Sequence, residues 1–273
     1  MADNRPIGVF DSGVGGLTAA RELQSILPGE DIIYFGDTGR VPYGSRSKDT
    51  LRTYASQIIR FLLGQGIKAL VVACGSISTN LAGEVITSQV PYVTVLDPAV
   101  RAAAVYTKNN RVGIIATAAT IRTGMFEKRL QALNSDIQAL GQPCPLLVPM
   151  IENGHTGFMD KISVPALEMY LQPVVDFGAD TLILGCTHYP LISDTISHIL
   201  NNRVSIVNTG ACAAHEMKIK LEAQNLLSCR ASGTTTYYVT DSVIGFASNA
   251  ESFLGDDITD RCIQIGLDAI GGY

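Results

Sequence analysis

Short apolar runs alternate with amphipathic segments along almost the whole chain. Residues 69–73 and 181–184 are nearly continuous apolar runs, which is typical of a strand buried on both faces of a parallel sheet. Residues 49–63 instead repeat apolar side chains with the helical period, and glycines at positions 64 and 66 end the segment. This alternation of strand and helix patterns predicts an α/β protein with mainly parallel sheets.

Two sets of four predicted strands follow one another along the chain. The first set covers residues 6–10, 32–35, 69–73 and 92–96, and the second covers residues 111–115, 145–150, 181–184 and 204–207. Helices are predicted at residues 17–27, 49–63, 79–87, 124–133, 163–177 and 192–200. In each set the third strand runs into a cysteine, Cys74 or Cys186. We infer an internal duplication that forms two pseudo-symmetric Rossmann-like or flavodoxin-like α/β units with an active-site cleft between them.

The chain beyond residue 210 adds elements to one of these units. Its pattern predicts a helix at residues 213–227, a strand at residues 236–239 and an amphipathic segment from Ser242. The sequence alone does not decide which unit they complete. We assign them to the first, which gives a discontinuous domain of residues 1–97 plus 210–273 and a second domain of residues 98–209.

The two cysteines at strand ends are the main candidates for chemistry, because ligands of open α/β sheets bind at the carboxyl ends of the strands. Two thiols that face one carbon from opposite sides could remove a proton from one face and deliver a proton to the other, which inverts a stereocentre. A free thiol has a pKa of about 8.5, so forming the thiolate needs help. Asp11 could assist Cys74, His188 could assist Cys186, and Glu152 is a third titratable candidate.

Hydroxyl groups and loop N–H groups near the predicted strand ends suit the carboxylates of an amino-acid ligand. They belong to Ser12, the loop of residues 42–45, Ser76, Thr117, Thr120 and Thr187. Thr117 and Thr120 could equally cap the helix that follows them. No lysine lies in a recognisable pyridoxal-phosphate context, so we expect no cofactor, and the cysteine spacing predicts no metal site.

Composition argues against several classes of protein. The 273-residue chain has a net charge of −5 and a pI near 5.4, which argues against nucleic-acid and anionic membrane partners. It has no signal core at its N-terminus and no apolar run that approaches the ~20 residues of a membrane span, so we expect a cytoplasmic protein. No Cys-x-x-Cys pair occurs, and we expect reduced thiols, with inert packing roles for Cys144, Cys212, Cys229 and Cys262.

Several motifs together resemble glutamate racemase, of the aspartate/glutamate racemase superfamily. They are residues 10–17 (FDSGVGGL), residues 34–38 (YFGDT) with 42–44 (PYG), Val148 and Pro149 with Glu152, and residues 185–191 (GCTHYPL). The resemblance extends from about residue 6 to about residue 265, and the order of the motifs makes it specific. It implies cofactor-independent interconversion of L- and D-glutamate, which supplies D-glutamate for peptidoglycan.

The resemblance also implies roles for individual residues. Cys74 and Cys186 would be the two acid/base residues, with Asp11 and His188 as their assistants and Glu152 as a third participant. The substrate-binding positions would be Asp11, Ser12, Pro42, Tyr43, Gly44, Gly75, Ser76, Thr117, Thr120, Thr187 and His188. The expected partners are a small-molecule substrate, glutamate, and a second copy of the chain in a homodimer.

Two positions depart from the family pattern. The family has Asn-Thr after the first cysteine, where this chain has Gly75 and Ser76. Gly75 removes an amide that would bind substrate, at a typical cost of about 1 to 3 kcal/mol. The family has Asp-Ser-Gly where this chain has Asn208, Thr209 and a glycine. A related racemase with altered substrate preference or weak activity is therefore an alternative.

Two further readings use fewer of these features. Cys186 and His188 could form a hydrolase or acyl transferase, which would leave the second strand-end cysteine without a role. A two-domain amino-acid-binding protein that has lost its chemistry through Gly75 is the third reading. The glycine-rich stretch after Asp11, taken alone, is a tight strand-to-helix turn and not the dinucleotide-binding fingerprint.

Overall fold

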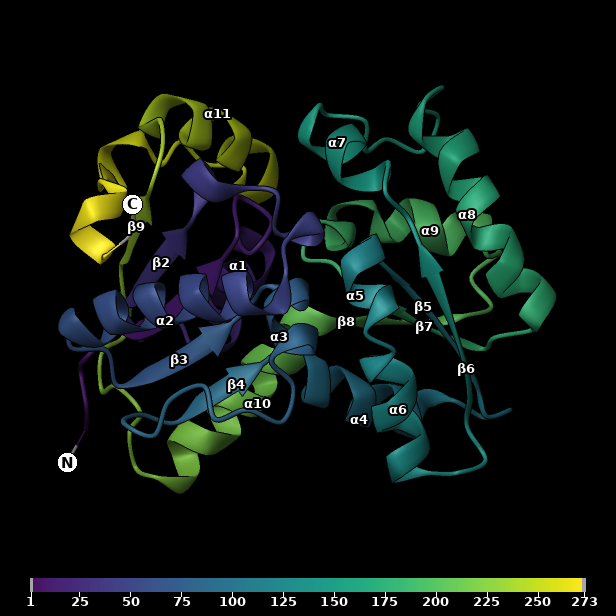
Figure 1. The fold of residues 1–273 in the computed structure, drawn as a ribbon, viewed down its shortest axis with the longest axis horizontal. Helices are drawn as coiled ribbons and strands as arrows, with labels where there is room; N and C mark the ends of the chain where they lie inside the picture. The colour runs from purple at the N-terminus through teal and green to yellow at the C-terminus, as the bar shows by residue number, and fades with distance from the viewer. Residues whose placement is uncertain (1, 272–273) are drawn as a thin grey trace.

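The computed structural model describes residues 2–271, in which ten strands form two parallel sheets (Figure 1). The first sheet has the order β10-β9-β2-β1-β3-β4 and the second has the order β6-β5-β7-β8. The first sheet consists of β1 (Ile7–Asp11), β2 (Ile32–Gly36), β3 (Ala69–Val72), β4 (Tyr92–Thr94), β9 (Thr235–Val239) and β10 (Cys262–Gln264). The second sheet consists of β5 (Arg111–Ala116), β6 (Gln138–Pro143), β7 (Thr181–Leu184) and β8 (Ser205–Asn208).

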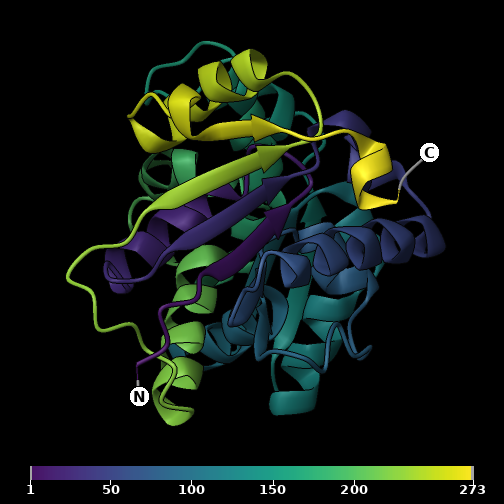
Figure 2. The same ribbon diagram turned by 90° about the vertical axis from the view of Figure 1, so that its left-hand side faces the viewer.

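Both sheets repeat the same strand order. In the first, β2-β1-β3-β4 are neighbours, and in the second, β6-β5-β7-β8 occupy the corresponding places, with all pairs parallel. This confirms the predicted pair of pseudo-symmetric α/β units. The late strands β9 and β10 extend the first sheet beyond β2, as Figure 2 shows where the green and yellow strands lie beside the purple ones. Residues 1, 272 and 273, at the ends of the predicted first domain, lie outside the described residues.

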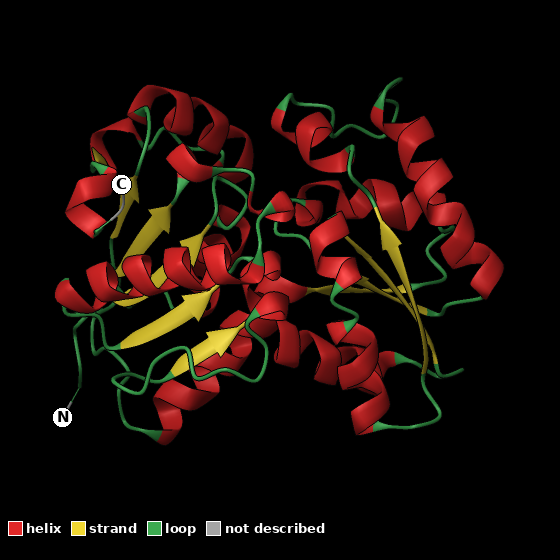
Figure 3. Ribbon diagram, viewed as in Figure 1, coloured by secondary structure: helices red, strands yellow, loops and turns green. Residues whose placement is uncertain are grey.

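Helices cover both faces of the sheets (Figure 3). In chain order they are α1 (Leu17–Ile26), α2 (Lys48–Gly64), α3 (Gly75–Asn80), α4 (Leu96–Tyr106), α5 (Ala118–Arg122), α6 (Met125–Leu133), α7 (Leu147–Glu152), α8 (Ser163–Phe177), α9 (Ser193–Ile199), α10 (Thr209–Ala223) and α11 (Val243–Leu254). α4 and α10 pack against each other, and each also contacts strands of the second sheet. α10 in addition packs on α1, so these helices connect the two units.

The continuous apolar runs are explained by burial on both faces of the strands. In β1, Ile7 and Val9 belong to the core that contains α1, whereas Phe10 belongs to the core on the opposite face, with α2. β7 divides its side chains in the same way: Leu182 and Leu184 face one core and Ile183 the other. No helix among residues 2–271 is long and apolar enough to cross a membrane.

The second strand of the second unit was predicted at the wrong place. The strand is β6, and most of the segment predicted as a strand, residues 145–150, belongs to helix α7. β6 is a partly exposed edge strand of sequence QALGQP, so it lacks an apolar run. In α7, Leu147 and Ile151 lie one helical turn apart and are both buried, so the apolar run serves a helix.

Three other elements differ from the prediction. The helix predicted at residues 79–87 is α3, which begins directly after Cys74 and ends at Asn80. The strand predicted at residues 92–96 ends at Thr94, and α4 follows with Pro98 in its first turn, where proline is tolerated. The short strand β10, which is largely exposed, was not predicted.

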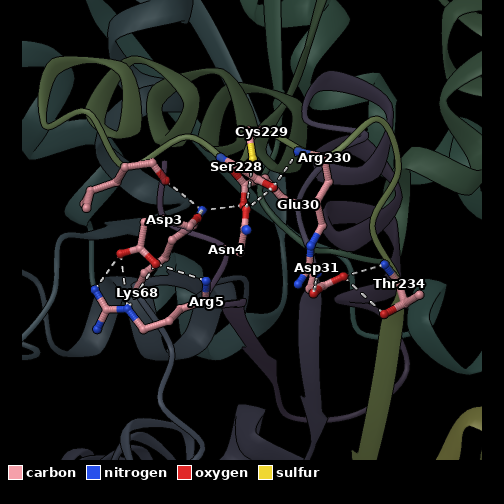
Figure 4. Close-up of polar contacts among 11 residues, drawn as sticks. Asp3, Asn4, Arg5, Glu30, Asp31, Lys68, Ser228, Cys229, Arg230 and Thr234 are labelled. Atoms are coloured by element: carbon pink, nitrogen blue, oxygen red, sulfur yellow. Dashed lines mark hydrogen bonds and ion pairs between the residues drawn. The ribbon is translucent and has the colours of Figure 1, made fainter. Parts of the chain in front are cut away.

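A buried ion pair fastens the segment after α10 to the beginning of the chain (Figure 4). Lys68 Nζ lies 2.5 Å from Glu30 Oε2, and both side chains are almost fully buried. The same ammonium donates to the carbonyl oxygens of Asp3 and Leu226, and Glu30 Oε1 accepts the N–H of Ser228. Because a buried charge is tolerated only when it is paired, this cluster fixes the connection that leads into β9.

Candidate active site

The candidate catalytic residues lie at the carboxyl ends of three strands. Asp11 is the last residue of β1, Cys74 follows β3, and Cys186 follows β7. These three side chains and His188 are all buried. Figure 1 shows α3, which begins after Cys74, beside α5 of the second unit, and the two helices are in contact.

Cys74 lies in an environment that disfavours the thiolate. Burial, and next the neighbouring carboxylate of Asp11, raise the pKa of the Cys74 thiol to about 12. Hydrogen bonds from the Ser12 hydroxyl and from the N–H groups of Ser76 and Ile77 act in the opposite direction and favour the thiolate. Without a substrate, Cys74 is therefore a thiol with hydrogen-bond donors already in place for its anion.

Asp11 is held by the loop that follows β1. Its Oδ2 accepts the N–H groups of Gly13 at 3.2 Å and Gly16 at 3.0 Å. Burial raises the pKa of Asp11, while the positive charge of His188 and the N–H groups oppose that rise. Asp11 therefore lies within electrostatic reach of both Cys74 and His188.

Cys186 is linked to a histidine and a glutamate. His188 Nδ1 lies 3.7 Å from Cys186 Sγ, and His188 Nε2 lies 2.8 Å from Glu152 Oε1. Burial alone would lower the pKa of His188, but its contacts with Cys186 and Glu152 outweigh burial and raise this pKa to about 10. A protonated imidazole can donate a hydrogen bond to the sulfur of Cys186 from one nitrogen and to Glu152 from the other.

The loops of the two units touch each other at this point. Thr18 Oγ1, on α1 of the first unit, donates to the carbonyl oxygen of Thr187 at 2.7 Å. A Cβ placed on Gly15 would lie 2.4 Å from the ring of His188, so only glycine fits there. The strand-end loops that were predicted to meet across a cleft are thus in direct contact.

The remaining predicted binding residues lie around the same junction. Gly44 lies close to Thr117 of the second unit, and its carbonyl oxygen accepts a hydrogen bond from Arg122 at 3.3 Å. Thr117 caps α5 by accepting the N–H of Thr120, which confirms the capping interpretation, while substrate binding by these threonines stays a prediction. Ser76 is buried in the first turn of α3, and Pro42 directly precedes the short helical turn of residues 43–45.

A polar network under this loop was not predicted. The hydroxyl of Tyr43 donates to the buried carboxylate of Asp37, which also accepts from Arg40 Nε at 2.6 Å and Thr240 Oγ1 at 2.9 Å. The guanidinium of Arg40 stacks 4.0 Å above the ring of Tyr54. The hydroxyl of Tyr43 is therefore already engaged, and its ring is almost fully buried. Thr240 is far away in the sequence, so no local motif could reveal the whole network.

Other features of the site also depend on distant segments. The ring of Phe253, on α11, meets His188 edge-on with 5.6 Å between centroids.

Among residues 2–271, no group of three His, Cys, Asp or Glu side chains is arranged to hold a metal ion.

Comparison with known proteins places this geometry in context. The sequence profile of the family described as Asp/Glu/Hydantoin racemase matches residues 17–217. A glutamate racemase from Thermoanaerobacter pseudethanolicus is 39% identical over 259 residues, which cover 94% of this chain and 96% of that protein.

Solved structures give the same relationship. The glutamate racemase of Francisella tularensis, crystallised in complex with D-glutamate, superposes with a TM-score of 0.88 and 37% identity, covering 98% of this chain and 99% of that one. A glutamate racemase isoform from Bacillus anthracis gives a TM-score of 0.91 and 35% identity, with 97% and 98% of the two chains covered.

Proposed function

The chain belongs to the Asp/Glu/Hydantoin racemase family and is an isomerase, and from that premise we propose that it interconverts L- and D-glutamate without a cofactor. The observation that carries the proposal is the pair of buried thiols at equivalent strand ends, Cys74 and Cys186, on loops that touch. Relatives named glutamate racemase that match nearly the whole chain support the choice of substrate.

The reaction moves one proton off Cα and another onto it. A thiolate at Cys186 takes the proton from one face of Cα, and the electron pair of the broken C–H bond stays on the carbon. The thiol of Cys74 gives its proton to the opposite face and becomes the thiolate. In the reverse direction the two roles are exchanged. His188 and Glu152 hold the anion at Cys186, and the donors around Cys74 hold the anion that forms there.

The substrate contacts belong to the same proposal. Hydroxyl and N–H groups at the junction bind the two carboxylates and the amino group, with His188 and Asp11 adjoining the reacting carbon. These groups come from Ser12, Tyr43, Gly44, Gly75, Ser76, Thr117, Thr120 and Thr187. Pro42 has no N–H group, and its proposed part is to place the loop that leads to Tyr43 and Gly44.

We also propose the wider setting of the enzyme. It acts in the cytoplasm, where its D-glutamate supplies peptidoglycan synthesis, and it forms a homodimer. Its domains are residues 1–97 plus 210–273 and residues 98–209; the pairing of β9 with β2 supports the discontinuous first domain.

Proton exchange at Cα tests the proposed reaction. The purified protein is incubated with L-glutamate or D-glutamate in deuterium oxide, and NMR follows the Cα proton while chiral chromatography follows the enantiomers. We expect deuterium at Cα in the inverted product from either enantiomer. Parallel incubations with aspartate and other amino acids show whether an enzyme with Gly75 at this position prefers a substrate other than glutamate. Tight binding of glutamate without exchange would support a binding protein instead.

One observation favours a second candidate function. The chain of contacts from Cys186 through His188 to Glu152 matches the nucleophile, base and orienting acid of a cysteine hydrolase or acyl transferase. That enzyme would form an acyl adduct on Cys186 and would not need Cys74. Mass spectrometry of the protein after incubation with activated esters distinguishes the two.

A further inference from the structure

The main chains of the two cysteine loops meet at Gly75 and Gly185. A Cβ built on Gly75 would lie 2.6 Å from the carbonyl oxygen of Gly185, a distance that real Cβ atoms essentially never show. We propose that Gly75 is a positioning residue that sets the separation of the two thiol-bearing loops, and so the balance between inversion and simple exchange at Cα. This inference rests on the proposed two-thiol reaction.

The contact lies directly beside both thiols. Gly75 follows Cys74 in the chain, and Gly185 precedes Cys186. Any atom added between the two glycines must therefore move one cysteine loop away from the other.

Neither loop can easily retreat from the contact. The N–H of Gly185 donates to the carbonyl oxygen of Ile115 at 2.8 Å, and a Cβ at Gly185 would meet the methyl group of Ala116 at 2.9 Å. On the other side, the carbonyl of Gly75 accepts a hydrogen bond from Thr79 Oγ1 at 2.9 Å within α3. The space between the loops is thus fixed by packing behind each of them.

The need for glycine at this position is one of space and not of backbone conformation. Gly75 does not lie in the left-handed region, and it is the first residue of α3, where alanine is a better helix former. The helix itself would therefore favour alanine at this position, and the close approach of Gly185 is what leaves no room for a side chain.

A wider gap should separate the two halves of the reaction. Proton removal needs only the nearer thiolate, whereas inversion also needs the opposite thiol within reach of the carbanion. A displacement of about 1 Å can cost about 10²-fold in rate. With a wider gap the carbanion persists longer, and the proton on the sulfur that removed it exchanges with solvent deuterium. Reprotonation from the same face then places deuterium on Cα without inversion. The ratio of exchange to inversion therefore reports the separation directly.

The experiment compares Gly75→Ala and Gly75→Asn with the unchanged enzyme in deuterium oxide. For Gly75→Ala we expect inversion to fall by about 10- to 100-fold, exchange to fall less, and their ratio to rise several-fold. Gly75→Asn should show a larger change in the same direction. The matched control is Gly64→Ala at the end of α2, where a Cβ would meet nothing within 4 Å, and its rates should be unchanged.

A second variant opens the same contact without adding an atom, so it cannot fail through a clash. Ala116→Gly removes the methyl group behind Gly185, and we expect it to raise the exchange-to-inversion ratio more weakly. An unchanged exchange-to-inversion ratio in Gly75→Ala would overturn the inference while the two-thiol reaction stands. If Gly75→Ala does not fold, an unchanged ratio in Ala116→Gly decides in the same way. An unchanged enzyme that neither exchanges nor inverts any amino acid tested would instead overturn the proposed function, and this inference with it.

Discussion

Cys74 and Cys186 occupy equivalent positions in the two units but have opposite surroundings. Each follows the third strand of its unit. Cys74 meets the carboxylate of Asp11, and the pKa of its thiol is raised to about 12. Cys186 meets His188, whose own pKa is raised to about 10. The shared fold determines where the thiols lie, and the titratable residue beside each thiol makes their electrostatic surroundings different.

This difference makes the two sides of the site unequal. The surroundings of Cys74 favour its thiol form, whereas the imidazole beside Cys186 has a raised pKa and can donate a hydrogen bond to the sulfur. The experiments below test this difference.

The largest effect is expected from removing either sulfur. Cys74→Ala and Cys186→Ala should each lower racemisation by about 10³-fold or more, because each removes an acid/base group that both directions require. Circular dichroism of the glutamate enantiomers measures the rate. The exposed Cys229 is the control, and Cys229→Ala should be fully active. If either single catalytic variant racemised at the normal rate, the two-thiol mechanism would be wrong.

Replacing His188 acts directly on the Cys186 side and reaches Cys74 only through Asp11. His188→Gln keeps a polar side chain but removes the positive charge beside the sulfur, and kcat should fall by about 10²-fold. At neutral pH, alkylation of Cys186 by iodoacetamide should slow, while alkylation of Cys74 should change little; peptide mapping separates the two. Equal slowing at both cysteines would show that the sides do not differ as described.

The pH dependence follows from the raised pKa of His188. The imidazole is protonated in the folded state up to about pH 10, but in the unfolded chain only up to about 6.5. With Cys186 as the proposed thiolate, the folded and unfolded chains hold equal numbers of protons on this pair until the unfolded thiol ionises at about pH 8.5. The free energy of unfolding should therefore decrease as pH rises from about 8.5 to 10. Urea titrations across this range measure the trend, and His188→Gln should reduce it. A trend that survives the substitution would assign the raised pKa to another group.

Glu152 should have a smaller effect than His188. Glu152→Gln can still accept the imidazole N–H but loses the negative charge, so the pKa of His188 should fall and kcat should decrease by about 10-fold. The high-pH limb of the rate profile should move to lower pH in this variant. A lower rate with an unmoved limb would mean that Glu152 only orients the ring.

The sequence predicted those parts of the fold in which burial produces a recognisable pattern of apolar residues. β1, β3 and β7 are buried on both faces, so their apolar runs were unmistakable, and the resemblance to glutamate racemases was confirmed. β6 was not predicted, because an exposed edge strand needs no apolar run. The apolar run at residues 145–150 was predicted as a strand although most of it is helical, because buried strands and buried helices use the same apolar residue types.

The residues of the candidate site also divide into those that a local sequence pattern indicates and those that it does not. Asp11, Cys186 and His188 could be found because each lies in a local motif at a strand end. The support of Tyr43 by Asp37 and Thr240, and the contact between Gly75 and Gly185, join segments that are far apart in the chain. The first follows from the pairing of β9 with β2 inside the first unit, and the second from the contact between the two units. No local pattern encodes either of them.

The smallest expected effect tests how the first unit holds the Cys186 loop. Thr18→Val removes the hydroxyl that donates to Thr187, which should lower the free energy of unfolding by about 1 to 3 kcal/mol and kcat by a few-fold. Thr209→Val is the matched control: it loses a comparable bond, from Thr209 Oγ1 to the carbonyl of Leu184, but that bond does not join the two units. Both variants should unfold at lower urea concentration, and only Thr18→Val should lose rate. Equal rates would mean that the Cys186 loop keeps its place without Thr18, and that His188 and Glu152 are sufficient to hold it.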